Sequence, residues 1–539
     1  MTDVERNRLG SIEVNRDTLA TSTKLAPTSP SLGKKIISFP ALLGVLLVGG
    51  IFIPLRNFSV DPDVWWHIKV GATLLSTHRW PTVDPYSFTA RGSPWIAYEW
   101  LGEVLLAAAQ RAGGFRGLMA LDLVLTAAIL IAIYALATLR CENPKAAFVI
   151  CAVMLPLVYP SCSLRPQMLG YLFLVLTLIV LERFRQGHTG ALWLLPLLFL
   201  VWVNTHGSFV LGLFALGVYW ASGLVDIHWG ELASRLWTSG ERLRLELVAL
   251  LSLVALTITP YGTEICLYPM NMAFSQPINV ANIQEWQSMS FDAFFGKLFL
   301  ALILGFALAQ VTLRPAWRLE ELVLFFAGVV AACLHLRFVL VFVPFCAPVL
   351  AVIVARRIPP YEPTRDKYAL NAILMTLVVA AIVWFFPSRA RLESIMEEKW
   401  PVKAVAYLKA HPAPVPMYNT YGYGGYLIWQ LDGQNMVFVD GRADIYERVG
   451  VLADYLSISR LGVAAPFLLD AYSIQSCLIN RDDALGTLLS ALPGWQKTYS
   501  DPHSVLYVRR PRPAEAVNSR NDTGAETSSR RGSSRGSRH

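Results

Sequence analysis

Residues 61–103 read DPDVWWHIKVGATLLSTHRWPTVDPYSFTARGSPWIAYEWLGE, and they follow directly on an apolar segment at 36–55. The stretch gathers acidic, histidine and tryptophan side chains where a first membrane helix would end: Asp61, Asp63, His67, Asp84, Glu99 and Glu103 with Trp65, Trp66, Trp80, Trp95 and Trp100. Tryptophan suits a membrane interface because one end of its ring system is apolar and the other is wet. Carboxylates do not, so the stretch indicates either a solvated loop or a catalytic or binding pocket at the membrane surface.

The composition of the chain is that of a membrane protein. It has 539 residues, 54% of them hydrophobic and 16% charged, whereas a soluble protein carries about a quarter charged residues. Several apolar runs reach the roughly 20 residues that a helix needs to cross a hydrocarbon core. The sequence therefore predicts an α-helical polytopic membrane protein. Segment 36–55 is not expected to be a cleaved signal peptide, because a long polar stretch precedes it and no small-residue cleavage site follows.

We predict eleven membrane spans, at 36–55, 115–138, 146–161, 167–184, 190–204, 207–225, 245–260, 296–313, 320–335, 337–355 and 369–387. If residues 1–35 are cytoplasmic, lysine and arginine are concentrated in the connections on the cytoplasmic side of the membrane. An odd number of spans then puts the C-terminal part outside. The chain is thus expected in the inner (cytoplasmic) membrane, with a cytoplasmic N-terminus and an extracytoplasmic C-terminal domain.

The expected domain organisation has four parts. Residues 1–35 form a disordered cytoplasmic N-terminus, and 36–388 form the transmembrane part, with its first extracytoplasmic loop at 56–114. Residues 389–510 form a small α/β domain, and the polar tail 511–539 is expected to be disordered. The net charge of +8 is modest and lies largely in cytoplasmic connections and the tail, so nucleic acid is not an expected partner. The 7 cysteines show no CxxC pair and no disulfide framework.

Five further polar motifs fall on the same predicted outer face as the first loop: LRPQ at 164–167, NTHGS at 204–208, PYG at 260–262, QEW at 284–286 and HLR at 335–337. Charged groups at membrane depth cost about 2.5–3.5 kcal/mol on insertion scales, so they usually face a cavity. The pattern predicts one shared extracytoplasmic cavity, with substrate-binding candidates His67, Arg165, Asn204, His206, Glu285, His335 and Arg337. Alternatively, each is a satisfied polar group at a helix end, and NTHGS is a sharp turn.

Two interfacial helices are expected in the first loop, at 63–77 and at about 97–112. Asp63 would stand at the N-terminus of the first, where a carboxylate can simply cap the helix. Glu99 would be a first-turn acid of the second, which the helix dipole favours in any case. Capping is therefore the alternative to a catalytic role for both residues.

The C-terminal domain is predicted to alternate strands and helices. Strand-like runs are VPMYN at 415–419, NMVFVDG at 435–441, SIQSCLIN at 473–480 and VLYVRR at 505–510. YGYGGY at 421–426 is not a nucleotide-binding glycine motif, and we expect a tight turn there. VDGRADIY places Asp440, Arg442 and Asp444 at a strand end, where ligands bind in open α/β sheets. Asp440 and Arg442 are thus candidates to hold an acceptor, or else part of a salt-bridged turn.

The order of these elements resembles that of the GT-C superfamily of membrane glycosyltransferases. One span is followed by an acidic residue, a loop of two interfacial helices and many further spans. The family includes protein O-mannosyltransferases, the lipid A aminoarabinose transferase and oligosaccharyltransferase subunits. DPD at 61–63 matches the family's acidic element, with Asp63 in the best position, and Glu99 in YEW matches its second element. The chain departs from the pattern in having no Asp-Glu pair and no PPL. It also resembles a group of bacterial envelope proteins with DxWWH, DPYSFT, EWL, GGYLIW and DGR.

The resemblance implies transfer, with inversion, of a sugar from a polyprenyl-phosphate donor to an extracytoplasmic glycan, lipid or protein acceptor. Asp63 is then the first candidate for the general base, with Asp61 and Glu99 behind it. Arg165 and Arg337 would hold the leaving phosphate, and Asn204 would orient a sugar hydroxyl. The resemblance allows a divalent cation, Mg or Mn, near the acidic residues, but no spacing here is diagnostic of one.

Two other functions stay open on the sequence. A transporter or flippase of lipid-linked glycan predicts polar residues at the bilayer midplane and broken helices in repeated halves. A non-enzymatic scaffold or sensor predicts only a periplasmic module on a membrane anchor. The polar motifs gather at one face and no repeat is evident, which favours the transferase.

Overall fold

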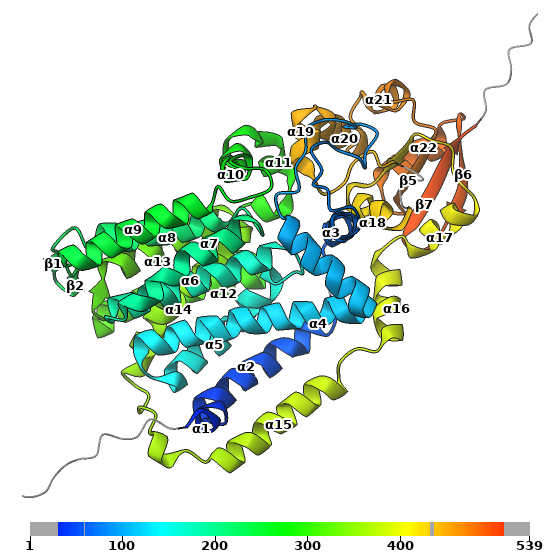
Figure 1. Ribbon diagram of the computed structural model, residues 1–539. Coiled ribbons are helices and arrows are strands. Elements are labelled where there is room, and N and C mark those ends of the chain that lie inside the picture. The colour runs from blue at the N-terminus through cyan, green and yellow to red at the C-terminus, as the bar shows by residue number, and fades with distance from the viewer. Residues whose placement is uncertain (1–30, 59, 432–435, 511–539) are drawn as a thin grey trace, which may run out of the picture.

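The computed structural model describes residues 31–58, 60–431 and 436–510. A bundle of apolar helices carries a small α/β domain at one end, and the first loop lies between the two (Figure 1). The expected fold class, a multi-pass helical membrane protein with a C-terminal α/β domain, is confirmed. Residues 1–30 and 511–539, for which disorder is expected, lie outside the described residues.

All eleven predicted spans coincide with helices. They are α2 (Phe39–Leu55), α4 (Trp100–Cys141), α5 (Pro144–Val158), α6 (Gln167–Arg185), α7 (Leu195–Val203), α8 (Phe209–Ser222), α9 (Ser239–Ala255), α12 (Phe294–Leu313), α13 (Leu319–Leu334), α14 (Val339–Ala355) and α15 (Tyr368–Trp384). Within the described residues, six helices are long and apolar enough to cross a membrane, or seven if the bent pair of α15 and α16 (Arg389–Lys399) is one span. The number eleven therefore stays a prediction.

The first loop contains the two expected helices, but the second is joined to a span. The first is α3 (Val64–Thr77), and the second forms the start of α4, which is broken at Gly114. Gly114 has φ 56°, a left-handed conformation that glycine adopts without penalty. The two helices pack closely, because a β-carbon on Gly71 of α3 would overlap the backbone carbonyl of Glu103.

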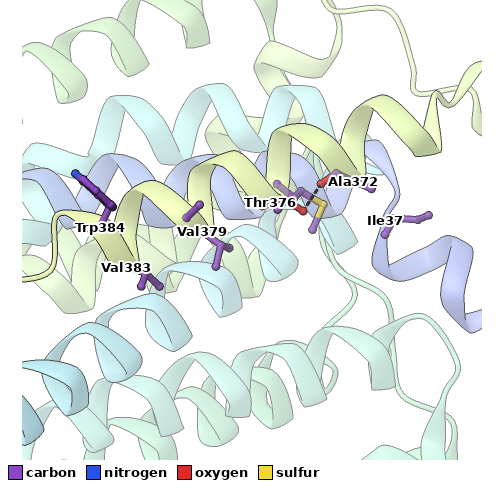
Figure 2. Close-up of a pocket in the computed structure, with 8 residues that line it drawn as sticks. Ile37, Ala372, Thr376, Val379, Val383 and Trp384 are labelled. Carbon is purple, nitrogen blue, oxygen red and sulfur yellow. Dashed lines mark hydrogen bonds between the residues drawn. The ribbon is translucent and has the colours of Figure 1, made fainter.

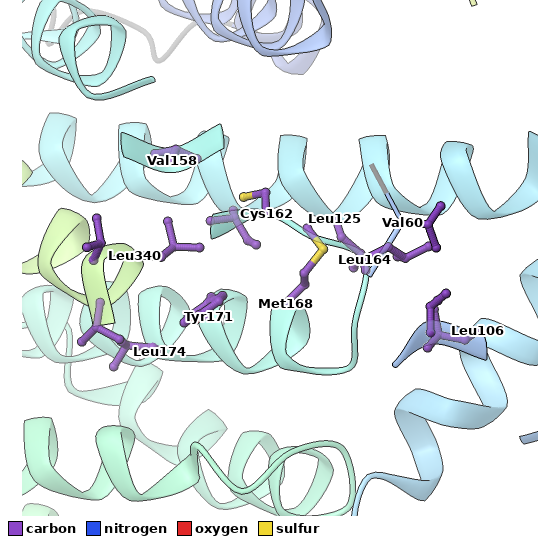
Figure 3. Close-up of a cluster of buried hydrophobic side chains, with 14 of the residues drawn as sticks. Val60, Leu106, Leu125, Val158, Cys162, Leu164, Met168, Tyr171, Leu174 and Leu340 are labelled. Carbon is purple, nitrogen blue, oxygen red and sulfur yellow. The ribbon is translucent and has the colours of Figure 1, made fainter. Parts of the chain in front are cut away.

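Figure 3 shows part of the buried apolar core. Leu106 and Leu125 of α4 belong to it with Leu164 and Met168, and all four side chains are buried. Leu164 immediately precedes Arg165 in the turn between α5 and α6. The packing of Leu164 therefore fixes the point from which the Arg165 side chain leaves the bundle.

At the edge of the bundle, α15 lies alongside α2, and an apolar groove runs along α15 (Figure 2). Ala372, Val379 and Val383 line this groove with Ile37 and Trp384. Trp384 is 83% exposed, which suits a helix that faces lipid. α16 then leads the chain from α15 into the C-terminal domain.

The C-terminal domain contains a four-stranded sheet in the order β4-β5-β7-β6. β4 (Met417–Asn419) and β5 (Ser476–Asn480) are parallel, whereas β7 (Ser504–Arg509) is antiparallel to both β5 and β6 (Trp495–Ser500). The helices of the domain are α17 (Val402–Ala410), α18 (Tyr421–Leu431), α19 (Ala443–Arg448), α20 (Val451–Ser459), α21 (Ala465–Ala471) and α22 (Ala484–Ala491). Three predicted strands are confirmed as β4, β5 and β7, and the sequence analysis missed β6.

Two local predictions for this domain are wrong. The described part of the expected strand 435–441 forms only an isolated bridge, Val437 with Ser87, because its partner is the first loop rather than the sheet. YGYGGY is not a tight turn but the start of α18. Its glycines serve close packing, since a β-carbon at Gly425 would lie 2.7 Å from the Pro62 carbonyl of the first loop.

Candidate functional site

Three carboxylates from two separate segments converge on one guanidinium. Arg165 Nε lies 3.5 Å from Asp61 Oδ2, Nη1 lies 3.6 Å from Asp63 Oδ2, and Nη2 donates to Glu285 Oε2 at 2.7 Å. All four side chains are partly exposed, so the cluster is accessible from the surface. Charged side chains of the first loop, the α5–α6 turn and the 284–286 segment thus lie together, while the shared cavity stays a prediction.

A second arginine joins this centre through the same glutamate. Arg337 Nη1 lies 3.5 Å from Glu285 Oε1, so Glu285 bridges the two guanidinium groups. Arg337 also lies over the Trp286 ring, 4.1 Å from its centroid. Burial opposes ionisation of Glu285, but the two arginines outweigh it and lower its pKa to about 2. The Glu285 carboxylate therefore stands where an anion is strongly stabilised.

Asp63 occupies the N-cap position of α3 but makes no capping hydrogen bond. Its carboxylate instead accepts from Trp66 Nε1 at 3.2 Å and faces Arg165. Burial, followed by the charge of Asp61, raises the pKa of Asp63 to about 8, against the opposing effect of Arg165. Simple helix capping is thus not the role of this side chain.

Glu99 lies deeper, between two imidazoles. His206 Nε2 is 3.2 Å from Glu99 Oε1, and His67 Nε2 is 3.4 Å from Glu99 Oε2. His206 Nδ1 accepts from the backbone N–H of Ser208 at 3.0 Å, within the NTHGS turn. Burial, reinforced by Asp63 and opposed by Arg165, raises the pKa of Glu99 to about 8.

Glu103 completes this arrangement, although it was not among the predicted site residues. Its Oε1 lies 3.1 Å from His67 Nδ1, so His67 is held between two glutamates of α4. Glu99 and Glu103 are four residues apart and therefore lie on one face of the helix start. That spacing is the signal in the sequence from which the pair can be recognised.

Two predicted binding residues are engaged elsewhere. Asn204 accepts from Trp100 Nε1 at 2.8 Å and donates to the carbonyls of Leu200 and Ile258. His335 Nδ1 lies 2.6 Å from the Trp286 carbonyl. Asn204 is buried with its amide fully used, so it joins the first loop to neighbouring helices, and the sugar contact stays a prediction.

Asp440 and Arg442 lie in a buried network rather than at a strand end. Arg442 donates to both oxygens of Asp440 at 2.8 and 2.6 Å and to Asp84 Oδ1 of the first loop at 2.6 Å. Tyr446 donates to Asp440 at 2.5 Å. Because these side chains are buried and paired, they join the C-terminal domain to the first loop, and their contact with an acceptor stays a prediction.

The C-terminal domain nevertheless forms part of the wall of the site. Gly441 packs against the Asp63 carboxylate so closely that a β-carbon there would overlap Oδ1. The Tyr421 hydroxyl donates to the Gly441 carbonyl at 3.2 Å. Glu447 accepts from the backbone N–H groups of Ile278 and Asn279, which fixes the segment before Glu285.

The residues expected near a divalent cation do not form a ligand set in this arrangement. Asp61 and Asp63 are paired with the Arg165 guanidinium, while Glu99 faces imidazoles. Among the described residues, no group of three His, Cys, Asp or Glu side chains has the geometry to hold a metal ion. A Mg or Mn ion therefore stays a prediction without a defined position.

No protein-family model and no curated protein matches the chain. Several solved structures are similar to the chain. The oligosaccharyltransferase of Archaeoglobus fulgidus with a tethered acceptor peptide is 12% identical over 87% of this chain and 74% of that one, with a TM-score of 0.49. ArnT from Cupriavidus metallidurans bound to undecaprenyl phosphate is 15% identical over 89% and 98%, with a TM-score of 0.47.

The arabinofuranosyltransferase AftD from mycobacteria is 14% identical over 89% of this chain and 42% of that one, with a TM-score of 0.46. A further structure of the archaeal enzyme, 12% identical over 86% and 73% with a TM-score of 0.45, is a complex with Zn and sulfate. All four TM-scores lie below 0.5.

Proposed function

We propose that the chain is a membrane glycosyltransferase that moves a sugar from a polyprenyl-phosphate donor to an acceptor at the first-loop end of the bundle. The observation that carries the proposal is the bridge Arg165–Glu285–Arg337. Two guanidinium groups that share one carboxylate are arranged to share one phosphate, because both anions offer paired oxygens to planar N–H donors.

The position of this pair suits a lipid-linked anion rather than a soluble one. Arg165 and Arg337 lie at the ends of the apolar helices α6 and α14, each next to a membrane-length segment. The apolar helices beside the two arginines can receive a lipid tail while the guanidinium groups hold its phosphate.

Glycosyl transfer further requires a proton acceptor near the phosphate, and the site offers carboxylates with raised pKa values. Asp63 and Glu99 both have a pKa of about 8, which is close to the value that a general base needs at neutral pH. The developing charge on the phosphate would be met by Arg165 and Arg337, which are already in place.

Two measurements test the proposal. Mass spectrometry of lipids extracted from the purified protein should find a polyprenyl phosphate, and Arg165→Ala should lose it while the exposed control Arg242→Ala keeps it. Labelled undecaprenyl-phosphate hexoses and pentoses, incubated with the protein and host envelope material, should release undecaprenyl phosphate and label an acceptor. A flippase would bind the lipid and move it across vesicles without cleaving it. A scaffold would do neither.

A further inference from the structure

Both oxygens of the Glu99 carboxylate contact imidazole nitrogens, and no described guanidinium forms an ion pair with Glu99. His67 and His206 approach its two oxygens from different segments, α3 and the NTHGS turn. The exposed fraction of the side chains falls from 12% at His206 to 8% at Glu99, 3% at His67 and 1% at Glu103. The chain of contacts through these four residues thus leads from the partly exposed His206 into the interior of the protein.

The contacts fix which ring nitrogen of each histidine carries the proton. His206 Nδ1 accepts from the Ser208 N–H, so the proton of the neutral ring is on Nε2 and is donated to Glu99. Burial lowers the pKa of His206 to about 3 and, with Arg165 and His206 nearby, lowers that of His67 well below its usual value. Both rings are therefore neutral, and each has a single N–H to give.

Which ring nitrogen of His67 carries the proton depends on the protonation of Glu103. The Oε2 atom of Glu103 is buried and makes no hydrogen bond with any described residue. A charge on Glu103 would be less stabilised than a charge on Glu99, which has two N–H donors and faces Arg165 and Arg337. Glu103 therefore keeps its proton and donates it to His67 Nδ1, so that His67 Nε2–H points at Glu99.

We infer that Glu99 is the proton-accepting carboxylate of the reaction, and that His67, His206 and Glu103 are positioning residues that hold it. The inference rests on the proposed function. In the step, the acceptor O–H or N–H bond breaks and its proton goes to Glu99. The electron pair released on the acceptor atom forms the new bond to the anomeric carbon, and the electron pair of the broken C–O bond leaves on the lipid phosphate.

The inference gives Asp63 a different task from the one expected on sequence. Asp63 and Asp61 orient Arg165, and so they lie on the phosphate side of the site. Inversion requires the acceptor and its base to stand on the opposite side of the sugar from the phosphate. Glu99, which makes no ion pair with Arg165, is free for that role.

The positioning roles of His67, His206 and Glu103 can be tested without a substrate. Solid-state NMR of the full chain in lipid nanodiscs with ¹⁵N-histidine reports the protonated nitrogen of each of the 9 histidines. His67→Gln and His206→Gln assign the two signals. We expect Nε2–H for both rings at pH 9, and the same for His67 in Glu103→Gln, because a carboxamide mimics the neutral acid. Nδ1–H at His67 would overturn the arrangement.

The catalytic part is tested by release of undecaprenyl phosphate. Glu99→Gln should lose at least a hundredfold in rate. His67→Phe keeps an aromatic ring but no N–H donor, so the pH profile should shift upward by about one unit. The exposed control Glu246→Gln should change nothing.

The outcomes distinguish a failure of the Glu99 assignment from a failure of the proposed function. If Glu99→Gln keeps its rate while Asp63→Asn loses it, Glu99 is not the acceptor of the proton. An unmoved pH profile in His67→Phe would also reject the positioning role. If the NMR result is as expected but no donor releases undecaprenyl phosphate, the proposed function fails and the assignment of Glu99 as its proton acceptor fails with it.

Discussion

Gly441 of the C-terminal domain lies directly against the carboxylate of Asp63, at the start of the first interfacial helix. The two residues are 378 positions apart in the chain, yet there is no room for a single methyl group between them. The sheet domain is therefore not an appendage of the membrane bundle, because it packs against the carboxylate that pairs with Arg165.

Replacing this glycine should disturb the site without unfolding the domain. Gly441 does not have a positive φ, so Gly441→Ala is strained only by close contacts, an overlap with the Asp63 carboxylate and an approach of 3.0 Å to Trp66 Nε1. We expect the release of undecaprenyl phosphate to fall at least tenfold at normal expression, since displacement of a positioned group by about 1 Å costs about a hundredfold in rate. Gly422→Ala is the matched control, because a β-carbon there meets no atom within 4 Å. Equal effects of the two substitutions would contradict the contact.

The two arginines should respond differently to lysine. Arg165 uses three nitrogens on three carboxylates, and a lysine can reproduce only one of these contacts. Arg165→Lys should therefore lose about 10²-fold in transfer rate, the usual size of losing a preorganised donor. Arg337 makes one 3.5 Å pair, so Arg337→Lys should lose about tenfold. The exposed control Arg242→Lys should be neutral, and a normal rate in Arg165→Lys would remove it as the phosphate clamp.

The transfer rate should rise with pH. A base acts when deprotonated, and burial raises the pKa of Glu99 to about 8, as it does for Asp63. Below pH 7 the rate should therefore fall about tenfold for each unit, and it should level off above about pH 9. His206, with a pKa of about 3, does not titrate in this range. A rate that is flat or falls between pH 6 and 9 would show that neither carboxylate is the base.

The buried network between the first loop and the C-terminal domain should contribute strongly to the free energy of unfolding of that domain. Asp84→Asn removes the charge that faces Arg442, and breaking one partner of a buried ion pair costs about 3–5 kcal/mol. Cys477 is buried in the domain and Cys346 in the bundle, so thiol labelling during heating reports each part separately. We expect Cys477 to react at a lower temperature in Asp84→Asn, and not in the exposed control Asp226→Asn. Unchanged labelling would mean that the domain is held by other contacts.

The sequence predicts the charged members of the site well, because charged residues beside apolar spans are rare. Arg165, Arg337 and Glu285 are recognisable in this way, and the structure brings them together. Their partners are harder to predict, since pairing depends on packing between distant segments. Glu103 looks like an ordinary acid in the first turn of a helix until Gly71 lets α3 approach α4. Arg442 and Asp84 are 358 positions apart, and no local pattern links them.

Helix positions could be predicted from hydropathy, whereas the backbone of the C-terminal domain could not be predicted in full. Segment 435–441 has the composition of a strand, but its described part pairs with Ser87 of the first loop. YGYGGY has the composition of a turn, but it forms the start of a helix in which Gly424 and Gly425 lie against the backbone of Val439 and Pro62. In both cases tertiary contacts outweigh local preference.

Membrane topology provides the last prediction. Arg442 pairs with Asp84 of the first loop, and Glu447 holds the backbone at Ile278 and Asn279, so all three segments lie at one end of the bundle. Arg140 and Glu321 pair at the cytoplasmic connections predicted from the lysine and arginine bias. Alkaline phosphatase fused after residues 395 and 510 should therefore be active, and green fluorescent protein at the same points should be dark. A fusion after residue 143 is the control and should give the reverse. Fluorescence at both C-terminal points would place the first loop in the cytoplasm as well, because the contacts tie the two together, and the donor site would then face the wrong side for an extracytoplasmic acceptor.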